Sequence, residues 1–384
     1  MAQEVRKLTE ALIRRESITP NDAGCQPLIA KRLQQAGMQL ESMRFGEVDN
    51  LLATIGEGSP HLLLLGHTDV VPSGPEDEWQ SPPFEAIERD GYLFGRGTAD
   101  MKSSDAAMVV ALEQFIESKA SFKGRISLLL TSDEEGPAVD GVKRVVPELE
   151  ARGLLPDFVL VGEPSSTNRL GDGIRIGRRG SIQAHLSVRG VQGHTAYADP
   201  MDNPAHRCGG LLAALGGMEV SDGEFNDGDA YFPATRLQIS NIQAGTGATN
   251  VTPGELSVWF NLRYNPSQTA NQLYEQFKQL IDAHQVGEYS LSWQVTGEPF
   301  GPARGPLFDA VKQACAEVLN VKPDANTGGG TSDGRFFGPI GIEVVELGPV
   351  NTSIHQVDEC IALDDLAKLP QVYLNIIQRM LNVE

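Results

Sequence analysis

The chain has 384 residues, of which 40% are apolar and 21% are charged. This composition is typical of a folded globular protein, and the length exceeds what one ordinary hydrophobic core supports, so we expect two domains. The formal net charge of -20, from 31 basic and 51 acidic residues, argues against nucleic acid or an anionic membrane surface as the main partner.

The N-terminal part of the chain alternates helical and strand-like patterns. Helical spacing covers residues 4–15 and 22–36, and Gly37 is a favoured residue just past a helix C-terminus. Short apolar segments that are typical of strands follow at residues 39–45, 51–55 and 62–65. The stretch over residues 71–84 is rich in Pro and Glu without periodicity, which predicts a loop after the third strand.

That third strand stops abruptly at the polar motif His67-Thr-Asp69. Open α/β sheets place their chemistry at the carboxyl ends of strands. A carboxylate beside an imidazole can accept one ring N–H and leave the other nitrogen free for a metal ion. A capped histidine in the core is the alternative for this motif taken alone.

Asp100 lies at the end of the segment Gly95-Arg-Gly-Thr-Ala-Asp100, directly before an apolar helical pattern through residues 106–115. The unpaired N–H groups at the start of a helix favour a carboxylate. A plain helix cap is therefore the alternative to a functional role for Asp100.

Two further apolar strands, which begin near residues 126 and 156, also end in carboxylates. The first leads to Glu134 and Glu135, and adjacent residues point in different directions, so one can bind a metal ion while the other reaches a water molecule. The second leads to Glu163. A solvated acidic loop is the alternative. Together with His67 and Asp100, these residues form a set that suits two zinc ions sharing a bridging carboxylate.

From Ser181 onwards the pattern changes to strands interleaved with helices. The strand-like segments lie at residues 183–188, 236–242 and 256–262, and the helical ones at residues 204–215 and 269–284. This order predicts a small α+β two-layer sandwich inserted into a larger domain. We expect the inserted domain to span residues 180–293, and residues 1–179 and 294–384 to form a discontinuous catalytic domain.

After Pro299 the α/β pattern returns. A helix is expected over residues 306–319, a strand over residues 342–347 and a final helix from about Asp364. The predicted fold class is therefore α/β, with a mixed central sheet flanked by helices. His355 follows the strand and is the remaining candidate imidazole ligand.

The segment Gly330-Thr-Ser332-Asp-Gly334 fits the G-x-S-x-G pattern of serine hydrolases, and Glu346 and His355 follow it in the expected order. However, the residues before it are Asn-Thr-Gly-Gly, whereas a nucleophile elbow requires an apolar strand there. We therefore disfavour a serine hydrolase.

The cysteines and the N-terminus bear on the cellular compartment. Cys25, Cys208, Cys315 and Cys360 lie far apart without a Cys-x-x-Cys pair, which predicts neither a thiolate zinc site nor a disulfide framework. The first residues lack the apolar core of a secretory signal, and no apolar run approaches the roughly 18 residues of a membrane span. We expect a cytoplasmic protein.

Several of these motifs together resemble the M20 family of dinuclear zinc deacylases and exopeptidases, over essentially the whole chain. The motifs are Gly66-His67-Thr-Asp69, Gly95-Arg-Gly-Thr-Ala-Asp100, Thr131-Ser-Asp-Glu134-Glu135, Gly162-Glu163-Pro and Ser353-Ile-His355. The resemblance implies a zinc exopeptidase-like fold with two zinc ions, for which cobalt can substitute. His67 and Glu163 would bind one ion, Glu135 and His355 the other, and Asp100 would bridge them.

The resemblance also implies roles for residues that are not metal ligands. Asp69 would orient His67, and Glu134 would be the general base. His194, in the inserted domain, would reach the site of the partner in a homodimer and stabilise the oxyanion. The residues implied to line the substrate pocket are Arg178, Ser181, Tyr197, Asn250, Arg263, Thr331 and Asn351.

The amino-acid sequences of residues 75–79, 176–181 and 329–333 resemble those of the branch of the family that hydrolyses N-succinyl-LL-2,6-diaminoheptanedioate. Arg178, Arg179 and Arg263 offer the planar donors that a dicarboxylic acyl group and an amino acid carboxylate need, although each can instead form a surface ion pair. Hydrolysis of acetylornithine or another acylamino acid is the alternative within the family. A catalytically silent metal-binding and dimerisation module is the alternative from another class.

Overall fold

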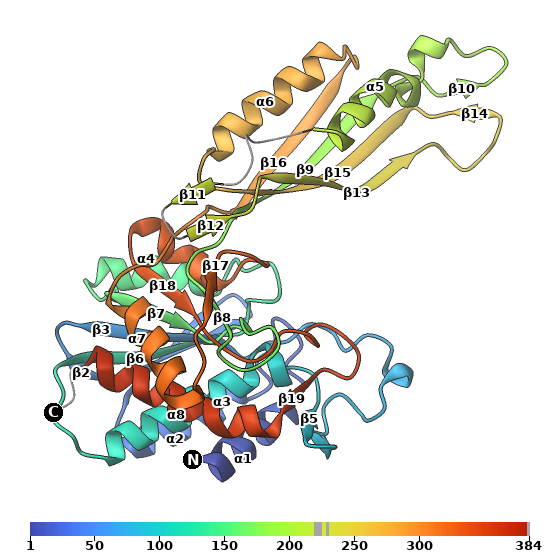
Figure 1. Cartoon of the computed structure of the whole chain (residues 1–384). Helices are drawn as coiled ribbons and strands as arrows, with labels where there is room; N and C mark the ends of the chain where they lie inside the picture. Colours follow the sequence, from blue (N-terminus) through green and yellow to red (C-terminus); the bar gives the residue numbers. More distant parts are fainter. Residues whose placement is uncertain (219–224, 228–229, 382–384) are drawn as a thin grey trace. The chain divides into compact units, whose positions relative to one another are not determined.

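A computed structural model describes residues 1–218, 225–227 and 230–381. The chain divides into two compact units (Figure 1). The first unit comprises Met1–Gly177, Gly301–Asn326 and Ser332–Glu384, and the second comprises Arg178–Phe300 and Thr327–Thr331.

The first unit is built on an eight-stranded mixed sheet. In spatial order its strands are β1 (Gln39–Phe45), β2 (Val48–Glu57), β6 (Gly124–Thr131), β3 (His61–His67), β7 (Phe158–Val161), β18 (Glu343–Glu346), β8 (Gly173–Arg175) and β17 (Asp324–Asn326). β1, β2 and β6 pair antiparallel, whereas β6, β3, β7 and β18 run parallel. The predicted α/β class with a mixed central sheet is confirmed.

The central strands are apolar because both faces of the sheet are covered. Every residue of β3 is buried, as are all but one of the residues of β6. The sequences of parallel strands that are buried on both faces are continuous apolar runs rather than alternating apolar and polar residues. Since β6, β3 and β7 run parallel, they deliver the residues that follow them to the same edge of the sheet.

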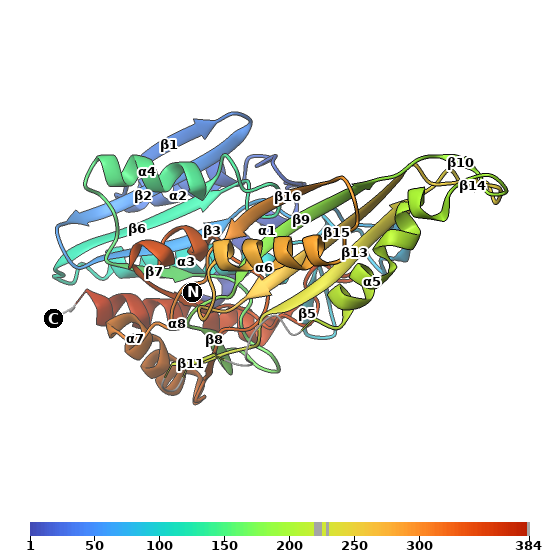
Figure 2. The same cartoon turned by 90° about the horizontal axis from the view of Figure 1, so that it is seen from above.

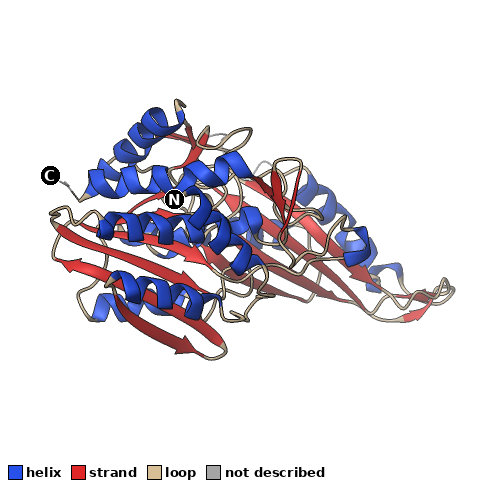
Figure 3. Cartoon of the chain, turned by 90° about the horizontal axis from the view of Figure 1, so that it is seen from below, coloured by secondary structure: helices blue, strands red, loops and turns tan. Residues whose placement is uncertain are grey.

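Helices cover the two faces of this sheet. α4 (Val142–Ala151) lies on one face (Figure 2). On the opposite face, α1 (Ala2–Ile13), α2 (Cys25–Ala36), α3 (Ser103–Glu117) and α8 (Leu363–Met380) pack against one another (Figure 3). α7 (Pro306–Ala314) packs against α8 and β18. α3 is buried almost all round, because it lies between the sheet and the other helices.

Short elements complete the first unit. A three-stranded sheet contains β19 (Cys360–Ala362), β5 (Tyr92–Phe94) and β4 (Ile87–Arg89). Single helical turns lie at Glu76–Glu78, Thr98–Lys102, Cys315–Leu319, Asp333–Phe336 and Gly338–Ile340.

The second unit is a two-layer sandwich. Its antiparallel sheet has the order β13 (Arg236–Ala244), β15 (Glu255–Tyr264), β9 (Gly180–Arg189) and β16 (Tyr289–Gly297), and α5 (Pro204–Gly216) and α6 (Ala270–Ala283) pack on it. A helical turn lies at Pro200–Asp202, and two short ladders pair β10 (Gly193–His194) with β14 (Val251–Thr252) and β11 (Phe225–Asp227) with β12 (Ala230–Phe232). The core contains stacked rings of Phe260 and Phe277, whose centroids lie 5.5 Å apart.

Two further features concern the helices and the cysteines of the described residues. No helix among them combines the length and the apolar character that a bilayer crossing requires. Cys25, Cys208 and Cys315 are buried free thiols, and Cys360 is a partly buried one.

Candidate metal centre

The predicted ligands come together in the first unit, where the parallel strands end. His67 is the last residue of β3, while Glu134 and Glu135 follow β6 and Glu163 follows β7. Asp100 lies in the turn before α3, and His355 in the loop between β18 and β19. Residues that are far apart in the sequence therefore meet because three parallel strands end at one edge of the sheet.

Two imidazoles face the same carboxylate from different directions. His67 Nε2 lies 3.2 Å from Asp100 Oδ1 and 3.7 Å from a carboxylate oxygen of Glu163. His355 Nε2 lies 3.3 Å from Asp100 Oδ2 and 2.9 Å from a carboxylate oxygen of Glu135. Each oxygen of Asp100 thus has its own histidine, which is the arrangement that a bridging carboxylate requires.

The donor set fits divalent metal ions. One ligand atom each from His67, Asp100 and Glu135 lie within 4.8 Å of one another, and the same holds for His67, Glu134 and Glu163. Imidazole nitrogens and carboxylate oxygens are common ligands of zinc in proteins. The chain therefore has a candidate metal site, and the share of each residue in it remains a prediction.

The contacts of His67 differ in detail from the prediction. Its Nδ1 donates a hydrogen bond of 2.9 Å to the backbone oxygen of Asp69, while the Asp69 carboxylate lies 3.7 Å away. That buried carboxylate instead accepts hydrogen bonds from the backbone N–H groups of Glu134 (3.3 Å) and Glu135 (3.1 Å). The strand ends at His67, and after it the Asp69 carbonyl faces the ring. Either way, Nδ1 carries a hydrogen, so Nε2 is the ring nitrogen that a metal ion can bind once its proton is displaced.

The structure does not support the helix-cap alternative for Asp100. Its backbone is not helical (φ -125°, ψ 97°), α3 begins only at Ser103, and no side chain caps that helix by a hydrogen bond. The carboxylate is directed to the two histidines instead.

Glu359 holds the Asp100 segment in place. Its carboxylate accepts hydrogen bonds from the backbone N–H groups of Gly97 (3.0 Å), Ala99 (2.8 Å) and Asp100 (3.0 Å). It also forms a buried ion pair of 2.7 Å with Arg96. Nothing in the sequence pattern singled out Glu359, and only its position four residues after His355 could have pointed to it.

Hydrogen bonds and burial shift the titration of the cluster. The hydrogen bonds to Asp100 and Glu135 raise the pKa of His355 to about 10. Burial lowers the pKa of His67, but the hydrogen bond to Asp100 and the charge of Glu163 outweigh this effect and raise it well above its usual value. For Asp100 the reverse holds, because the two imidazoles lower its pKa against the effect of burial.

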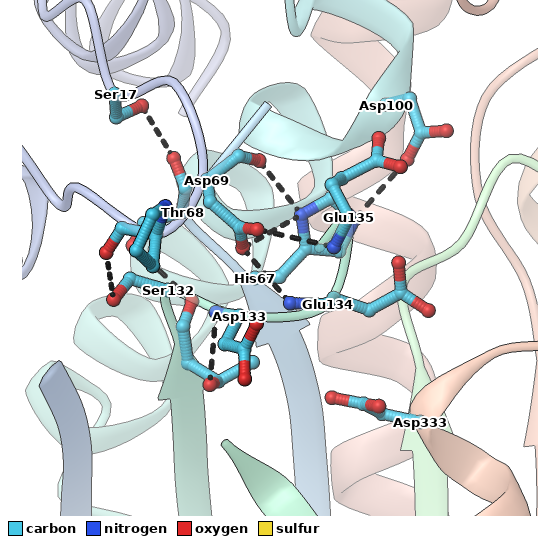
Figure 4. A network of polar contacts seen from close by, with 12 residues as sticks. Ser17, His67, Thr68, Asp69, Asp100, Ser132, Asp133, Glu134, Glu135 and Asp333 are labelled. Atoms are coloured by element: carbon cyan, nitrogen blue, oxygen red, sulfur yellow. Dashed lines mark hydrogen bonds and ion pairs between the residues drawn. The ribbon is translucent and has the colours of Figure 1, made fainter. Parts of the chain in front are cut away.

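Glu134 and Glu135 point in different directions (Figure 4). Glu135 lies beside Asp100, whereas Glu134 extends to another side, where Asp333 is its neighbour (Figure 4). Burial, followed by the charge of Asp333, raises the pKa of Glu134 well above its usual value. Burial also raises the pKa of Asp333 to about 7. In the sequence, Asp333 stood out only as part of the serine-hydrolase pattern and of the family-like segment 329–333, without a role of its own.

The contacts argue against the serine-hydrolase alternative. Ser332 Oγ donates a hydrogen bond to Glu346. His355 Nε2 is directed to Glu135 and Asp100. No hydrogen bond joins Ser332 to His355 among the described residues, so the serine–histidine pair of a serine hydrolase is not formed there.

One group of predicted pocket residues lies where β9 begins. The Arg178 guanidinium donates a hydrogen bond of 2.7 Å to the Gly328 carbonyl in the segment that contains Thr331. Ser181 accepts a hydrogen bond of 2.8 Å from the Thr296 hydroxyl and pairs in register with Arg263 on β15.

A second group lies beyond the other end of the same sheet. His194 on β10 and Tyr197 have ring centroids 5.5 Å apart, and Tyr197 is 90% exposed. The backbone oxygen of Asn250 accepts a hydrogen bond of 3.0 Å from Thr195. Since β9 runs from Gly180 to Arg189, a rise of about 3.3 Å per residue puts the two groups roughly 30 Å apart.

Asn351 is the one predicted pocket residue in the first unit. It follows β18, and its backbone N–H donates a hydrogen bond of 3.0 Å to the Ser166 carbonyl. The structure thus brings the predicted metal ligands together, but it does not unite the predicted pocket residues of the second unit.

The fold and the imidazole–carboxylate cluster define a metal-dependent hydrolase of the exopeptidase type. The sequence profile of peptidase family M20/M25/M40 matches residues 63–379, and the chain belongs to this family.

Curated relatives cover nearly the whole chain. The succinyl-diaminopimelate desuccinylase of Stenotrophomonas maltophilia (strain R551-3) is 52% identical over 377 residues, which are 98% of this chain and 99% of the relative. The enzymes of the same name from Xanthomonas euvesicatoria pv. vesicatoria (strain 85-10) and Hydrogenovibrio crunogenus (strain DSM 25203 / XCL-2) are 51% and 48% identical, with the same coverage.

Solved structures of the family share the fold. The M20 family metallo-carboxypeptidase Sso-CP2 from Sulfolobus solfataricus superposes with a TM-score of 0.82 at 16% identity, covering 98% of this chain and 99% of that one. The YXEP protein of Bacillus subtilis, described as a dinuclear metal binding peptidase from the M20 family, gives a TM-score of 0.75 at 14% identity, with coverage of 100% and 99%.

Proposed function

We propose that the protein hydrolyses N-succinyl-LL-2,6-diaminoheptanedioate to succinate and LL-2,6-diaminoheptanedioate, a step of diaminopimelate and lysine biosynthesis. The observation that carries this proposal is the identity of 48% to 52%, over almost the full length of both chains, to relatives named succinyl-diaminopimelate desuccinylase. The cytoplasmic location remains a prediction from the sequence.

The five clustered ligands would hold two zinc ions, with cobalt as a substitute. His67 and Glu163 would bind one ion, Glu135 and His355 the other, and Asp100 would bridge them. The separate contacts of the two Asp100 oxygens support this division. When bound, such a pair of ions lowers the pKa of water from about 15.7 towards about 7 and polarises the amide carbonyl.

Glu134 would act as the general base. Its side chain diverges from the neighbouring ligand Glu135, so it is free to meet the attacking water (Figure 4). The raised pKa suits a group that first accepts a proton from water and then gives it to the leaving amine. Asp69 would orient His67 through its backbone oxygen, and its carboxylate would fix the turn that carries Glu134.

Arginines and polar side chains would bind the two ends of the substrate. Arg178 and Arg263 would bind carboxylates, because a guanidinium matches a carboxylate with two parallel hydrogen bonds. Ser181 lies opposite Arg263 on the neighbouring strand, which favours a shared role. Thr331 and Asn351 would supply further polar contacts.

The second unit would form a homodimer. β13 is an edge strand of the sheet, and Ile242 on it is 48% exposed, so it offers backbone groups and apolar surface to a second copy. In the dimer, His194, Tyr197 and Asn250 would complete the site of the partner, where His194 would stabilise the oxyanion.

Replacement of the general base tests the mechanism. We expect Glu134→Ala to retain both metal ions but to lower turnover by about 10³-fold or more, because proton transfer is lost. Metal content by mass spectrometry and steady-state kinetics measure the two effects. Turnover close to that of the native protein would refute the assignment of the base.

A comparison of two substrates tests the acyl preference. The zinc-loaded protein should hydrolyse succinyl-diaminopimelate in clear preference to acetylornithine. The reverse preference would favour an acylamino acid deacetylase. Absence of any amidase activity after zinc reconstitution would favour the silent metal-binding module.

A further inference from the structure

A cavity of about 260 Å³ lies in the first unit at the edge of the mixed sheet opposite to the metal centre. It is lined by residues of β1, β2, β6 and β3 and by the C-terminal end of α4. β3 begins at His61 in this cavity and ends at His67 in the metal centre. Six steps of about 3.3 Å separate the two residues by roughly 20 Å, so the cavity is a separate site.

Five of the thirteen residues that line the cavity are leucines, and polar side chains make up most of the remainder. The leucines that line the cavity are Leu40, Leu52, Leu63, Leu149 and Leu154. Binding sites for small molecules are mostly apolar, with a few polar groups that fix the orientation of the ligand. The volume lies slightly below the range of about 300 to 1,000 Å³ that is typical of drug-sized ligands, which indicates a smaller molecule.

A chain of polar groups crosses the floor of the cavity. Thr54 Oγ1 lies 2.9 Å from Ser127 Oγ, which in turn lies 2.9 Å from His61 Nε2. Burial, together with the charge of Arg125, lowers the pKa of His61 to about 4. The imidazole is therefore neutral at pH 7, and these three side chains offer hydrogen bonds without a net charge.

Arg125 supplies a positive charge that no carboxylate balances. It pairs in register with His61, and among the described residues no hydrogen-bond partner reaches its buried Nε and no carboxylate forms an ion pair with it. The other arginine in the lining, Arg152, is engaged by two hydrogen bonds of 2.8 Å to Glu41. A partly buried guanidinium without a counter-charge favours an anionic ligand.

We propose that this cavity binds a small aliphatic carboxylate, with its carboxylate group on Arg125 and its hydrocarbon chain among the leucines. The hydroxyls of Thr54 and Ser127 would add hydrogen bonds along the floor. The observations on which this rests, the cavity, its leucines and the unbalanced Arg125, are independent of the reaction at the metal centre.

The test uses 4,4,4-trifluorobutanoate as the probe and ¹⁹F NMR of the zinc-loaded protein as the measurement. We expect saturable binding to the native protein and an affinity at least about tenfold lower in Arg125→Gln, since a charge-assisted hydrogen bond is lost. Leu154→Trp, which fills the cavity and keeps Arg125, should also abolish binding. Arg144→Gln is the matched control, because Arg144 does not line the cavity and its contacts are an exposed ion pair with Asp140 and a cation–π contact with Phe45.

The variant His355→Ala distinguishes binding at the metal centre from binding in the cavity. If the probe binds in the cavity, this variant should bind it as the native protein does. Loss of the probe in His355→Ala, with retention in Arg125→Gln, would place the ligand at the metal centre and overturn the proposal. Equal affinity in the native protein, Arg125→Gln and Leu154→Trp would also overturn it.

Discussion

Asp100 contributes to the raised pKa of both histidines in the metal-free protein. Its two oxygens lie within 3.3 Å of the imidazoles of His67 and His355, and Glu135 adds a second contact to His355. Because the pKa of His355 is raised to about 10, this imidazole carries a proton at pH 7 when no metal is bound. A metal ion has to displace that proton, since only the neutral nitrogen is a ligand.

Metal binding should therefore release protons and tighten as the pH rises. The pKa of His355 is about 10, so this side chain is protonated throughout the range from pH 6 to pH 8. In that range the apparent affinity for zinc should increase about tenfold per pH unit for each proton that the metal displaces. Calorimetric titration of the metal-free protein in buffers of different ionisation enthalpy measures the release. His355→Ala should release fewer protons, and an affinity that does not change with pH would contradict the prediction.

The sequence predicted the residue types at this site better than the atoms that make the contacts. His67, Asp100, Glu134, Glu135, and Glu163 stood out because each follows an apolar strand or precedes an apolar helix. The contact of His67 with the backbone oxygen of Asp69 could not be predicted, because it depends on how the chain turns after β3. The sequence gives the residue types directly, whereas the direction in which a carbonyl group points is known only once the chain is folded.

At the scale of elements, the backbone of the segment that carries Asp100 is held by hydrogen bonds to Glu359, a residue remote in the sequence. We call this set of hydrogen bonds the Glu359 clamp. Glu359 directly precedes β19, and its carboxylate accepts hydrogen bonds from three backbone N–H groups and from the Arg96 guanidinium. Its side chain is completely buried. A buried carboxylate with four donors is favourable only while all of them remain in place.

Glu359→Gln should loosen this clamp. The amide carries no charge for Arg96 and turns an NH₂ group towards backbone donors, so we expect the free energy of unfolding to fall by about 3 kcal/mol. Zinc content and turnover should fall as well, because Asp100 loses its support. Urea unfolding followed by circular dichroism and metal analysis measure these effects.

Glu113→Gln is the control for this substitution. Glu113 also forms a bidentate pair with an arginine, Arg32, but both side chains are partly exposed. The loss should stay below about 1 kcal/mol, and zinc content should not change. If Glu359→Gln behaved like the control, the clamp would have no role in placing Asp100.

Long periodic elements were predictable, and short or interrupted ones were not. β1 has the predicted bounds, and α3, α5, α6 and α8 lie where helical spacing indicated. α4 escaped prediction because it has ten residues and contains Pro147, and β8 and β17 have three residues each. Such strands depend on pairing with neighbours rather than on their own sequence pattern.

At the scale of the whole molecule, the separation of the predicted pocket residues points to a second copy of the chain. Arg178, Ser181 and Arg263 lie at one end of the second unit's sheet, and His194 and Asn250 lie beyond the other. The sheet is rigid along its strands, so bending cannot close a gap of roughly 30 Å within this unit. If all of these residues act on one substrate, the second group has to come from the partner of a homodimer.

Mixing two inactive variants tests this arrangement. In a heterodimer of Glu134→Ala and His194→Ala chains, one site would combine an intact Glu134 with an intact His194 from the other chain, and the second site would lack both. If His194 acts across the interface, an equal mixture refolded together should regain about a quarter of the native turnover, since half of the dimers are mixed and each has one working site. If His194 acts within its own chain, every site lacks one residue and no turnover returns. The same mixture left without subunit exchange is the control, and it should stay inactive in either case.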